Sequence, residues 1–303
     1  MLNGLRNLGN TCFMNSGLQI FLNCTYFNNK LLKYKKLCKS ELFTSYIKLV
    51  KDYNSNNGCI LSPNEFKMAI DKRYPLFRKF GQEDIYEFMT LFLSAIYDDL
   101  VECGVNNKDT DKDVIKNVLG INCTIFIKPI DKNIKLIHKN KSSEYVLHLE
   151  LDSNYEIEKP TELEDLIINL TLPKKIGIVG FDKPNKEICN LEAIRTTKID
   201  NCSQCMIIYL GRYKEVRKGN NFSYQKLHNK IKIPKIIEGS SHNYHLRSFA
   251  LHHGNSNGGH YVSYVNNNGI WYNLNDSNCS IISEKDALYY AMDAYVICYQ
   301  IEL

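Results

Sequence analysis

The amino-acid sequence predicts an α+β fold in which a helical part precedes a sheet-rich part. Apolar residues recur at helical spacing in the first part of the chain. From about residue 116 onwards, short alternating segments bounded by turn residues take over. The polar stretch 104–115 lies between the two patterns, and we expect it to be a loop.

Two segments of the first part are predicted helices, one after Cys12 and one over 81–100. In the first, apolar residues fall at helical spacing at Met14, Leu18, Phe21 and Leu22. In the second, one apolar stripe is formed by Ile85, Phe88, Met89, Phe92, Leu93, Ile96 and Leu100. The polar residues Gln82, Asp84 and Glu87 lie off this stripe.

The second part contains several predicted strands. In EYVLHLEL (144–151), alternation places Tyr145, Leu147, Leu149 and Leu151 on one side. The segments 206–213 and 244–253 are also predicted strands. Residues 260–275 predict a β-hairpin, because their central Asn-Gly pair suits a tight type I′ turn.

Composition excludes several classes of protein. The chain has 303 residues, of which 44% are hydrophobic and 23% charged, which is ordinary for a globular protein. No segment approaches the roughly eighteen apolar residues of a membrane helix, and the N-terminus lacks an export signal. The net charge of +5 comes from dispersed lysines. We therefore expect neither membrane nor nucleic-acid binding.

The cysteines indicate the compartment. There are 11 of them, an odd number at irregular spacings. Without an export signal, this usage favours free thiols in a reducing, intracellular location, in the cytoplasm or the nucleus.

Cys12 is the candidate nucleophile. It follows a turn at Gly9 and Asn10 and stands where the first helix should begin. A helix N-terminus favours the thiolate and lowers the pKa of the thiol. A single cysteine is more often a small buried hydrophobe, so the catalytic interpretation also needs a histidine and a group that orients it.

His260 is the candidate base. It follows the glycine-rich sequence GNSNGG and begins a predicted strand. The alternative is a surface histidine that flanks a loop.

The predicted hairpin supplies the third residue. With the Asn-Gly pair as a two-residue loop, residue 267 faces residue 270, and Asn275 lies on the same sheet face as His260. A four-residue loop gives the same face, whereas a three-residue loop would place Asp276 there. Asn275 is therefore the expected orienting residue, and Asp276 is its close rival.

Acyl transfer also needs donors for the oxyanion. Asn7 lies five residues before Cys12, and its side-chain amide is a candidate donor beside the Cys12 backbone N–H. The alternative is a plain turn asparagine, which spacing alone favours.

These segments together resemble the ubiquitin-specific proteases, a family of papain-like deubiquitinases. The cysteine box of that family is similar to GLRNLGNTCFMNSGLQ (4–19). Its histidine box is similar to YHLRSFALHHGNSNGGHYVSYVNNNGIWYNLNDSNCSII (244–282). Intervening and closing segments are similar to GQEDIYEFMTLFLSAI, MIIYLGRYKEV and DAYVICYQ, so the resemblance spans residues 4–300.

The resemblance implies a papain-like right hand with thumb, palm and fingers. Thumb helices would carry the cysteine, the palm sheet the histidine, and the Gly-Gly tail of ubiquitin would lie between them. It implies Cys12 as nucleophile, His260 as general base, Asn275 followed by Asp276 at the third position, and Asn7 as oxyanion donor.

The same resemblance implies the residues that bind the substrate. Polar positions near the arginine-bearing ubiquitin tail match Gln82, Asp84 and Glu87. Aromatic residues that line the channel match Tyr213 and Tyr261. At Gly259, beside the histidine, the missing side chain would let an extended substrate pass close to the backbone.

The chain departs from the family in its metal motif. Many members hold zinc in the fingers through two Cys-x-x-Cys pairs, but here only Cys202 and Cys205 form such a pair. Cys123 and Cys189 stand alone in the region of the fingers. Because structural zinc takes four ligands, we expect no metal and no cofactor.

We therefore expect a single catalytic domain over 1–303. A helical thumb would end near 115, reduced fingers would span about 116–200, and a palm sheet about 201–303. The expected activity is hydrolysis of isopeptide or peptide bonds after the C-terminal glycine of ubiquitin, with ubiquitin or its conjugates as partner. The alternatives are a catalytically weak ubiquitin-binding module and a protease for another ubiquitin-like modifier.

Overall fold

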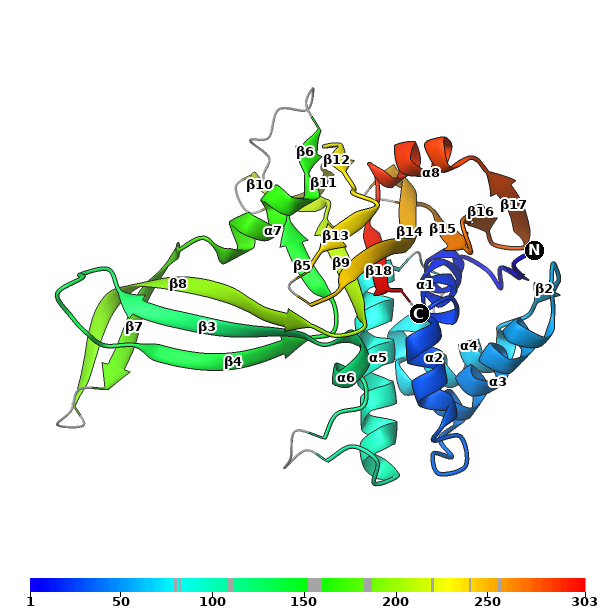
Figure 1. Ribbon diagram of the computed structural model, residues 1–303, viewed down its shortest axis with the longest axis horizontal. Helices are drawn as coiled ribbons and strands as arrows, with labels where there is room; N and C mark the ends of the chain where they lie inside the picture. The colour runs from blue at the N-terminus through cyan, green and yellow to red at the C-terminus, as the bar shows by residue number, and fades with distance from the viewer. Residues whose placement is uncertain are drawn as a thin grey trace.

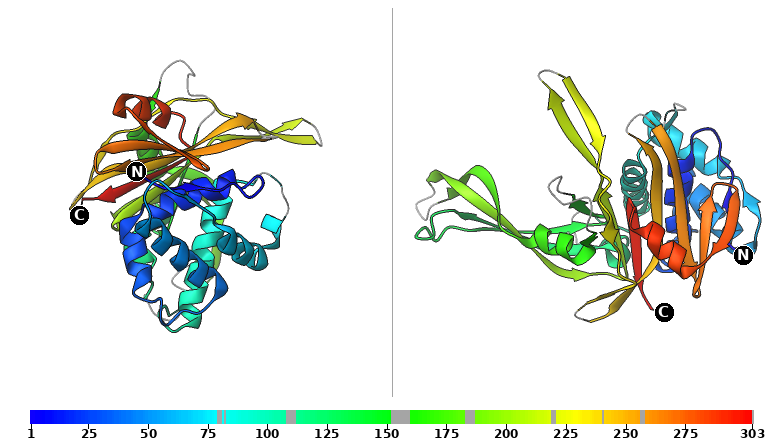
Figure 2. Two further views of the ribbon diagram at one scale, coloured as in Figure 1. Left: turned by 90° about the vertical axis from the view of Figure 1, so that its right-hand side faces the viewer. Right: turned by 90° about the horizontal axis from the view of Figure 1, so that it is seen from above.

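The computed structural model describes residues 1–302 except for 79–80, 82, 108–111, 152–159, 183–186, 219–220, 240 and 256–257. Helices from the first part of the chain pack on one side of a twisted sheet, and a long arm of strands projects away from both (Figure 1). The views in Figure 2 show the same helical lobe beneath the sheet and a second, thinner hairpin that also projects. The α+β prediction is confirmed.

The helical lobe carries the first functional residues. Its elements are α1 (Cys12–Leu22), α2 (Thr25–Leu32), α3 (Glu41–Ser55), α4 (Asn64–Arg73), the 3₁₀ turn η1 (Pro75–Arg78), α5 (Ile85–Glu102) and α6 (Lys116–Leu119). Every residue of α1 is buried, because the helix lies between α5 and the sheet. A side chain at Gly17 would meet the Phe88 ring at 2.8 Å, so this glycine lets α1 and α5 approach closely. The predicted apolar stripe of α5 is buried throughout.

The main sheet has eight strands and carries the C-terminal half of the site. Along the sheet the order is β17 (Asn278–Ile282), β16 (Ile270–Asn275), β15 (Gly258–Asn267), β14 (Asn243–Asn255), β18 (Val296–Ile301), β9 (Cys205–Gly211) and β5 (Leu147–Glu150), with β13 (Ile236–Glu238) also pairing with β14. Only the β5–β9 pair is parallel. The predicted strands are confirmed, and residue 267 does pair with 270 across a two-residue loop.

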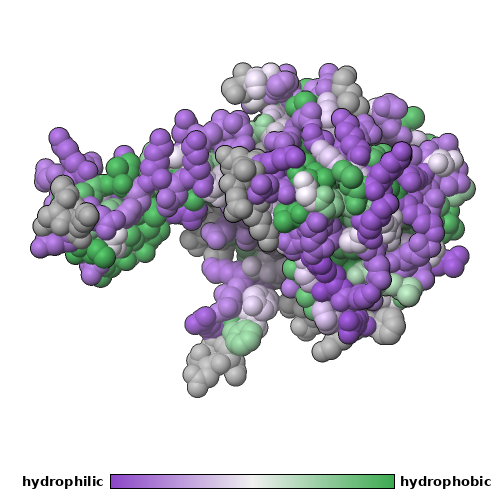
Figure 3. Space-filling view, turned by 90° about the horizontal axis from the view of Figure 1, so that it is seen from below, coloured by the Kyte–Doolittle hydropathy of each residue, from purple (hydrophilic) through white to green (hydrophobic). Residues whose placement is uncertain are grey.

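The projecting arm is a separate four-stranded antiparallel sheet. Its order is β4 (His138–Glu144), β3 (Ile121–Pro129), β8 (Ile188–Cys202) and β7 (Lys174–Asp182), with α7 (Leu163–Thr171) at its base. Exposed isoleucines of β7 and β8 include Ile178 and Ile188. Hydrophobic surface gathers at the far end of the arm (Figure 3). The arm strands lie within or just beyond residues 116–200, which we assigned to fingers, but α6, β5 and β6 in that range belong to the helical lobe, the main sheet and a separate strand pair.

Smaller elements complete the chain. They are the parallel pairs β1 (Gly4–Leu5) with β2 (Ile60–Leu61) and β6 (Thr161–Glu162) with β12 (Ile231–Lys232), the hairpin β10 (Tyr213–Lys218) with β11 (Asn221–Lys226), and α8 (Glu284–Ala291). Within the described ranges, no helix has the length and apolar character needed to cross a membrane.

The cysteines of the Cys-x-x-Cys motif point into different hydrophobic clusters. Cys205 is buried between the sheet and the helices, where its sulfur lies 3.2 Å from that of Cys24. Cys202 packs on the other side of the sheet, against Met206 at 3.9 Å. No set of three or more His, Cys, Asp or Glu side chains in the described part of the chain is placed to hold a metal ion.

The prediction that all cysteines are free thiols is wrong for one pair. Cys38 and Cys103 are joined by a disulfide, with Cα atoms 5.4 Å apart. They are 65 residues apart in the sequence, and packing of α3 on α5, with Ser40 bonded to Asp99, brings them together. The other nine cysteines are free.

Metal removal should leave the protein unchanged, because Cys202 and Cys205 face opposite sides of the sheet. After dialysis against a chelator, we expect the same unfolding temperature as before dialysis. Elemental analysis of protein purified without added metal should find well under one zinc per chain. A stoichiometric zinc that is lost when Cys202 is replaced by Ala would contradict this prediction.

Candidate active site

Cys12 is the first residue of α1 and follows a tight turn. Gly9 and Asn10 both have positive φ, 102° and 50°, which a glycine and an asparagine adopt at low cost. The turn is closed by Thr11, whose hydroxyl accepts the Leu8 N–H at 2.9 Å. Cys12 is 4% exposed, and α1 packs against β15, where the backbone N–H of Tyr261 acts to lower the pKa of the thiol. The thiol therefore lies next to the strand that carries His260.

His260 is oriented by Asn275. The imidazole Nε2 and the Asn275 Oδ1 are 2.7 Å apart. An amide oxygen only accepts, so Nε2 carries the proton and Nδ1 is left as the basic nitrogen. The hairpin register explains the contact, because the two-residue loop places both residues on one face, as predicted.

Asp276 does not point away from this site, as strand alternation had led us to expect. β16 ends at Asn275, and Asp276 has a φ of 49°, so alternation no longer applies to it. Its carboxylate lies 4.0 Å from the His260 Nε2. It accepts the Asn7 amide at 2.8 Å and the Asn15 amide at 2.7 Å. Asp276 therefore joins the sheet to the N-terminal segment and to α1.

The Asn7 side chain is held at both ends. Its oxygen accepts the Gly9 N–H at 2.9 Å and the Thr11 N–H at 3.2 Å, and its nitrogen donates to Asp276. An amide nitrogen has two hydrogens, so one remains for another acceptor. The plain-turn interpretation and the donor interpretation are thus both compatible with this geometry. Asn15, which sequence reasoning missed, shares the same carboxylate.

Burial decides the state of the free thiol. It raises the pKa of Cys12, and the negative charge of Asp276 raises it further. Backbone N–H groups of Tyr261, Phe13 and Cys12 act in the opposite direction. The helix start thus favours the thiolate, as expected. The net effect nevertheless raises the pKa of Cys12, against our prediction of a lowered pKa.

Cys12 opens onto a cavity of about 460 Å³. Of the predicted substrate-binding residues, the ones that line it are Asp84, Tyr213, Gly259 and Tyr261. Sequence reasoning missed the further lining residues Glu83, Tyr209, Tyr224, His252 and Asn255. Glu87 is exposed in the first turn of α5 but does not line the cavity, and Gln82 lies outside the described residues.

Asp84 is the N-cap of α5. Its carboxylate accepts the backbone N–H groups of Tyr86 at 2.7 Å and Glu87 at 3.2 Å, and the Tyr261 hydroxyl at 3.2 Å. Burial raises the pKa of this carboxyl. The side chain therefore joins α5 to β15 at the cavity wall, and much of its hydrogen-bonding capacity is used inside the protein.

Gly259 is required by the strands themselves. A side chain there would lie 2.2 Å from the His253 carbonyl oxygen and 2.4 Å from the His252 Nε2. His252 pairs across the strands with Tyr261, and its Nδ1 is 3.1 Å from the Tyr213 hydroxyl. Burial lowers the pKa of His252 to about 4, so it is neutral near pH 7. Counting back from the glycine-rich loop would have placed His252 opposite Tyr261.

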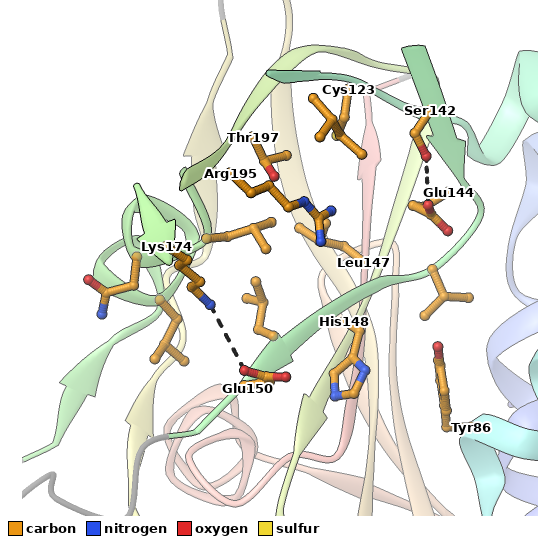
Figure 4. A pocket seen from close by; sticks show the side chains of 16 residues that line it. Tyr86, Cys123, Ser142, Glu144, Leu147, His148, Glu150, Lys174, Arg195 and Thr197 are labelled. Atoms are coloured by element: carbon orange, nitrogen blue, oxygen red, sulfur yellow. Dashed lines mark hydrogen bonds and ion pairs between the residues drawn. The ribbon is translucent and has the colours of Figure 1, made fainter. Parts of the chain in front are cut away.

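A second cavity, of about 300 Å³, lies between β5, the arm and α7. Figure 4 shows charges of both signs around it, with Lys174 3.9 Å from Glu150 and the Arg195 guanidinium pointing inward. Tyr86 from its wall stacks on Tyr209 of the Cys12 cavity, with ring centroids 4.2 Å apart. The two cavities are therefore neighbours that share a tyrosine wall.

Comparison with known proteins identifies the family. A family model described as ubiquitin carboxyl-terminal hydrolase matches residues 3–299. The chain belongs to this family. The resemblance seen in the sequence is thus confirmed.

Curated members of the ubiquitin carboxyl-terminal hydrolase family align with nearly all of the chain. Ubiquitin carboxyl-terminal hydrolase 4 of Arabidopsis thaliana is 25% identical over 93% of this chain and 86% of its own length. Ubiquitin carboxyl-terminal hydrolase 2 of Bos taurus is 24% identical, and human ubiquitin carboxyl-terminal hydrolase 42 is 26% identical. The chain spans 55% of the bovine protein and 22% of the human one.

Solved structures of the family share the fold. The SAGA Ubp8/Sgf11/Sus1/Sgf73 DUB module bound to ubiquitin aldehyde contains a chain that superposes with a TM-score of 0.81 at 20% identity. The match covers 100% of this chain and 70% of that one. A related SAGA DUB module bound to monoubiquitin gives a TM-score of 0.78.

Asp276→Asn should make Cys12 react at lower pH. The substitution keeps one acceptor oxygen, which serves either Asn7 or Asn15, and removes the negative charge that helps to raise the pKa of the thiol. The midpoint of the pH dependence of iodoacetamide alkylation, followed by mass spectrometry of the Cys12 peptide, should therefore fall. Asp165→Asn, an exposed position on α7, is the charge-matched control. An unchanged or higher midpoint in Asp276→Asn would exclude this electrostatic role.

We expect Asp84 to contribute to stability and Glu87 to contribute to substrate binding. Asp84→Ala removes the α5 cap and should cost about 0.5–2 kcal/mol in the free energy of unfolding measured with urea. Glu87→Ala should leave stability unchanged but raise the KM for a ubiquitin substrate more than it lowers kcat, because its exposed carboxylate is free to meet a cationic tail. Glu102→Ala, at the other end of α5, should change neither quantity. If Glu87→Ala leaves KM unchanged, Glu87 is not part of the substrate site.

Proposed function

We propose that this chain is a thiol-dependent deubiquitinase that hydrolyses isopeptide or peptide bonds after the C-terminal glycine of ubiquitin. The observation that carries the proposal is the 2.7 Å contact between the His260 Nε2 and the Asn275 Oδ1, on a strand whose residues Gly259 and Tyr261 line one cavity with Cys12. Membership of the family supports the same activity. Catalytic roles for these residues follow from their chemistry.

In the acylation step, the Cys12 sulfur attacks the carbonyl carbon of the terminal glycine. The Nδ1 of His260 takes the thiol proton, and the carbonyl oxygen becomes an oxyanion. The remaining Asn7 N–H and the backbone N–H at the start of α1 are the candidate donors for it. When the C–N bond breaks, His260 gives the proton to the leaving amine, and a thioester remains on Cys12.

In the second step, water hydrolyses the thioester. His260 removes a proton from the water, the hydroxide adds to the thioester carbon, and the C–S bond breaks. The sulfur takes back the proton, which frees the enzyme and a ubiquitin carboxylate. Asn275 keeps the imidazole in one tautomer through both steps, without adding the charge that an aspartate would supply.

The path of the ubiquitin tail follows from the cavities. Gly258 and Gly259 line the Cys12 cavity without side chains, which suits a substrate that itself ends in glycines. The stacked Tyr86 and Tyr209 connect this cavity to the one beside the arm. We infer that the tail runs past the tyrosines while the folded body of ubiquitin meets the arm. In this reading the lobe, the arm and the main sheet are thumb, fingers and palm.

Two alternatives share the family and differ in activity. A catalytically weak ubiquitin-binding module would retain ubiquitin without turnover. A protease for another ubiquitin-like modifier would turn over that modifier and leave ubiquitin conjugates intact. For location we infer the cytoplasm or the nucleus, which the nine free cysteines support and the Cys38–Cys103 disulfide does not.

Cys12→Ala should abolish hydrolysis of a fluorogenic ubiquitin conjugate and keep the affinity for ubiquitin, because the cavity does not depend on the sulfur. A ubiquitin with an electrophile at its C-terminus should label the wild-type protein at Cys12 alone. Cys59→Ala, which removes an exposed thiol, is the control and should retain full turnover. Turnover by the Cys12→Ala protein, or labelling at Cys202 or Cys205, would refute the assignment.

A further inference from the structure

A third cavity adjoins the Cys12 cavity at His252, which lines both, and it has a strongly basic lining. Its volume is about 340 Å³. The charged groups among its described lining residues are Arg212, Lys226, Lys230 and Asp293, so three cations face one carboxylate. Three imidazoles, those of His228, His252 and His253, also stand at its wall.

The single carboxylate is already paired. Asp293 forms an ion pair with Lys230. Lys226 donates only to main-chain carbonyls, that of His252 at 2.7 Å and that of Gly254 at 3.0 Å, and its ammonium lies 5.3 Å from the centre of the Tyr295 ring. In the described part of the chain, Lys226 therefore forms no ion pair.

Arg212, like Lys226, donates to main-chain carbonyls, and it is almost fully buried, at 1% exposure. Its guanidinium donates to the carbonyls of Ala294, Leu227, Asn229 and Met292. All four acceptors are neutral. Burial lowers the pKa of Arg212, and burial and the nearby Arg212 lower the pKa of Lys226. The negative charge of Asp293 acts in the opposite direction on both groups but does not offset these effects.

Donors remain for a ligand. An ammonium has three hydrogens, of which Lys226 uses two, and a guanidinium has five, of which Arg212 uses four. The remaining Arg212 hydrogen is on Nη2, whose bond to Met292 is the least buried of the four. A cavity of this size admits a small oxyanion together with water, since each water occupies about 30 Å³.

We propose that this cavity binds a phosphate-type oxyanion, held by Lys226 and Arg212 with Lys230 and the three imidazoles around it. Charged donors bind such oxygens with short, strong hydrogen bonds. Lys226 also holds the carbonyls of His252 and Gly254, and His253 pairs directly with His260 across the strands. The anion is therefore connected through one side chain to the hairpin that carries His260.

The experiment is a calorimetric titration of the whole chain with inorganic phosphate, against chloride at the same ionic strength. Saturable binding of phosphate alone is expected. Lys226→Gln, which keeps an amide donor for the carbonyls but loses the charge, should weaken binding about tenfold, which corresponds to about 1.4 kcal/mol. Asp293→Asn removes the one carboxylate among the described residues that line the cavity and should tighten binding. Lys36→Gln removes an exposed charge of the helical lobe and should change nothing.

The two variants are expected to change the affinity for phosphate in opposite directions, so the test remains decisive even if Lys226→Gln is less stable. O-phosphoserine as a second ligand separates the sources: tighter binding than phosphate identifies a phosphorylated side chain, and weaker binding identifies the free ion. The proposal fails if phosphate gives no more heat than chloride. It also fails if Asp293→Asn weakens binding or if folded Lys226→Gln binds like the wild type.

Discussion

The carboxylate of Asp276 holds the two halves of the site together. Cys12 stands near one end of the sequence and His260 near the other, on different layers of the fold. Asp276 follows the strand that orients His260, and it accepts amides from Asn7, before the nucleophile, and from Asn15, inside α1. Its own carbonyl accepts the Leu5 N–H at 2.8 Å. The left-handed backbone at Asp276 is what turns the carboxylate toward these partners.

The same arrangement has an electrostatic cost for the nucleophile. A carboxylate close to Cys12 and burial of the thiol both oppose ionisation, while three backbone N–H groups favour it. The net result is that the pKa of the Cys12 thiol is raised.

Much of this structure could be predicted from the sequence. The α5 stripe and the 260–275 hairpin follow local periodicity and turn chemistry, so the pairing of His260 with Asn275 followed from counting residues. The direction of the Asp276 side chain could not be predicted by counting residues along the strand, because β16 ends one residue earlier and a positive φ redirects the side chain. The Cys38–Cys103 bridge and the cap role of Asp84 depend on how helices meet, which spacing does not show. The prediction of a lowered pKa for Cys12 was also wrong, since burial of the thiol outweighs the effect of the helix start.

The position of β18 has a consequence for how the protein is made. β18 is the last strand of the sheet in chain order, yet it lies in the interior, between β14 and β9. Ribosomes add about 5–20 residues per second, so both neighbours leave the ribosome before the strand that separates them. Until then they present two unpaired edges, which invite pairing with other chains. A nascent chain is therefore most exposed to aggregation, and most in need of a chaperone, just before its synthesis reaches residues 296–301.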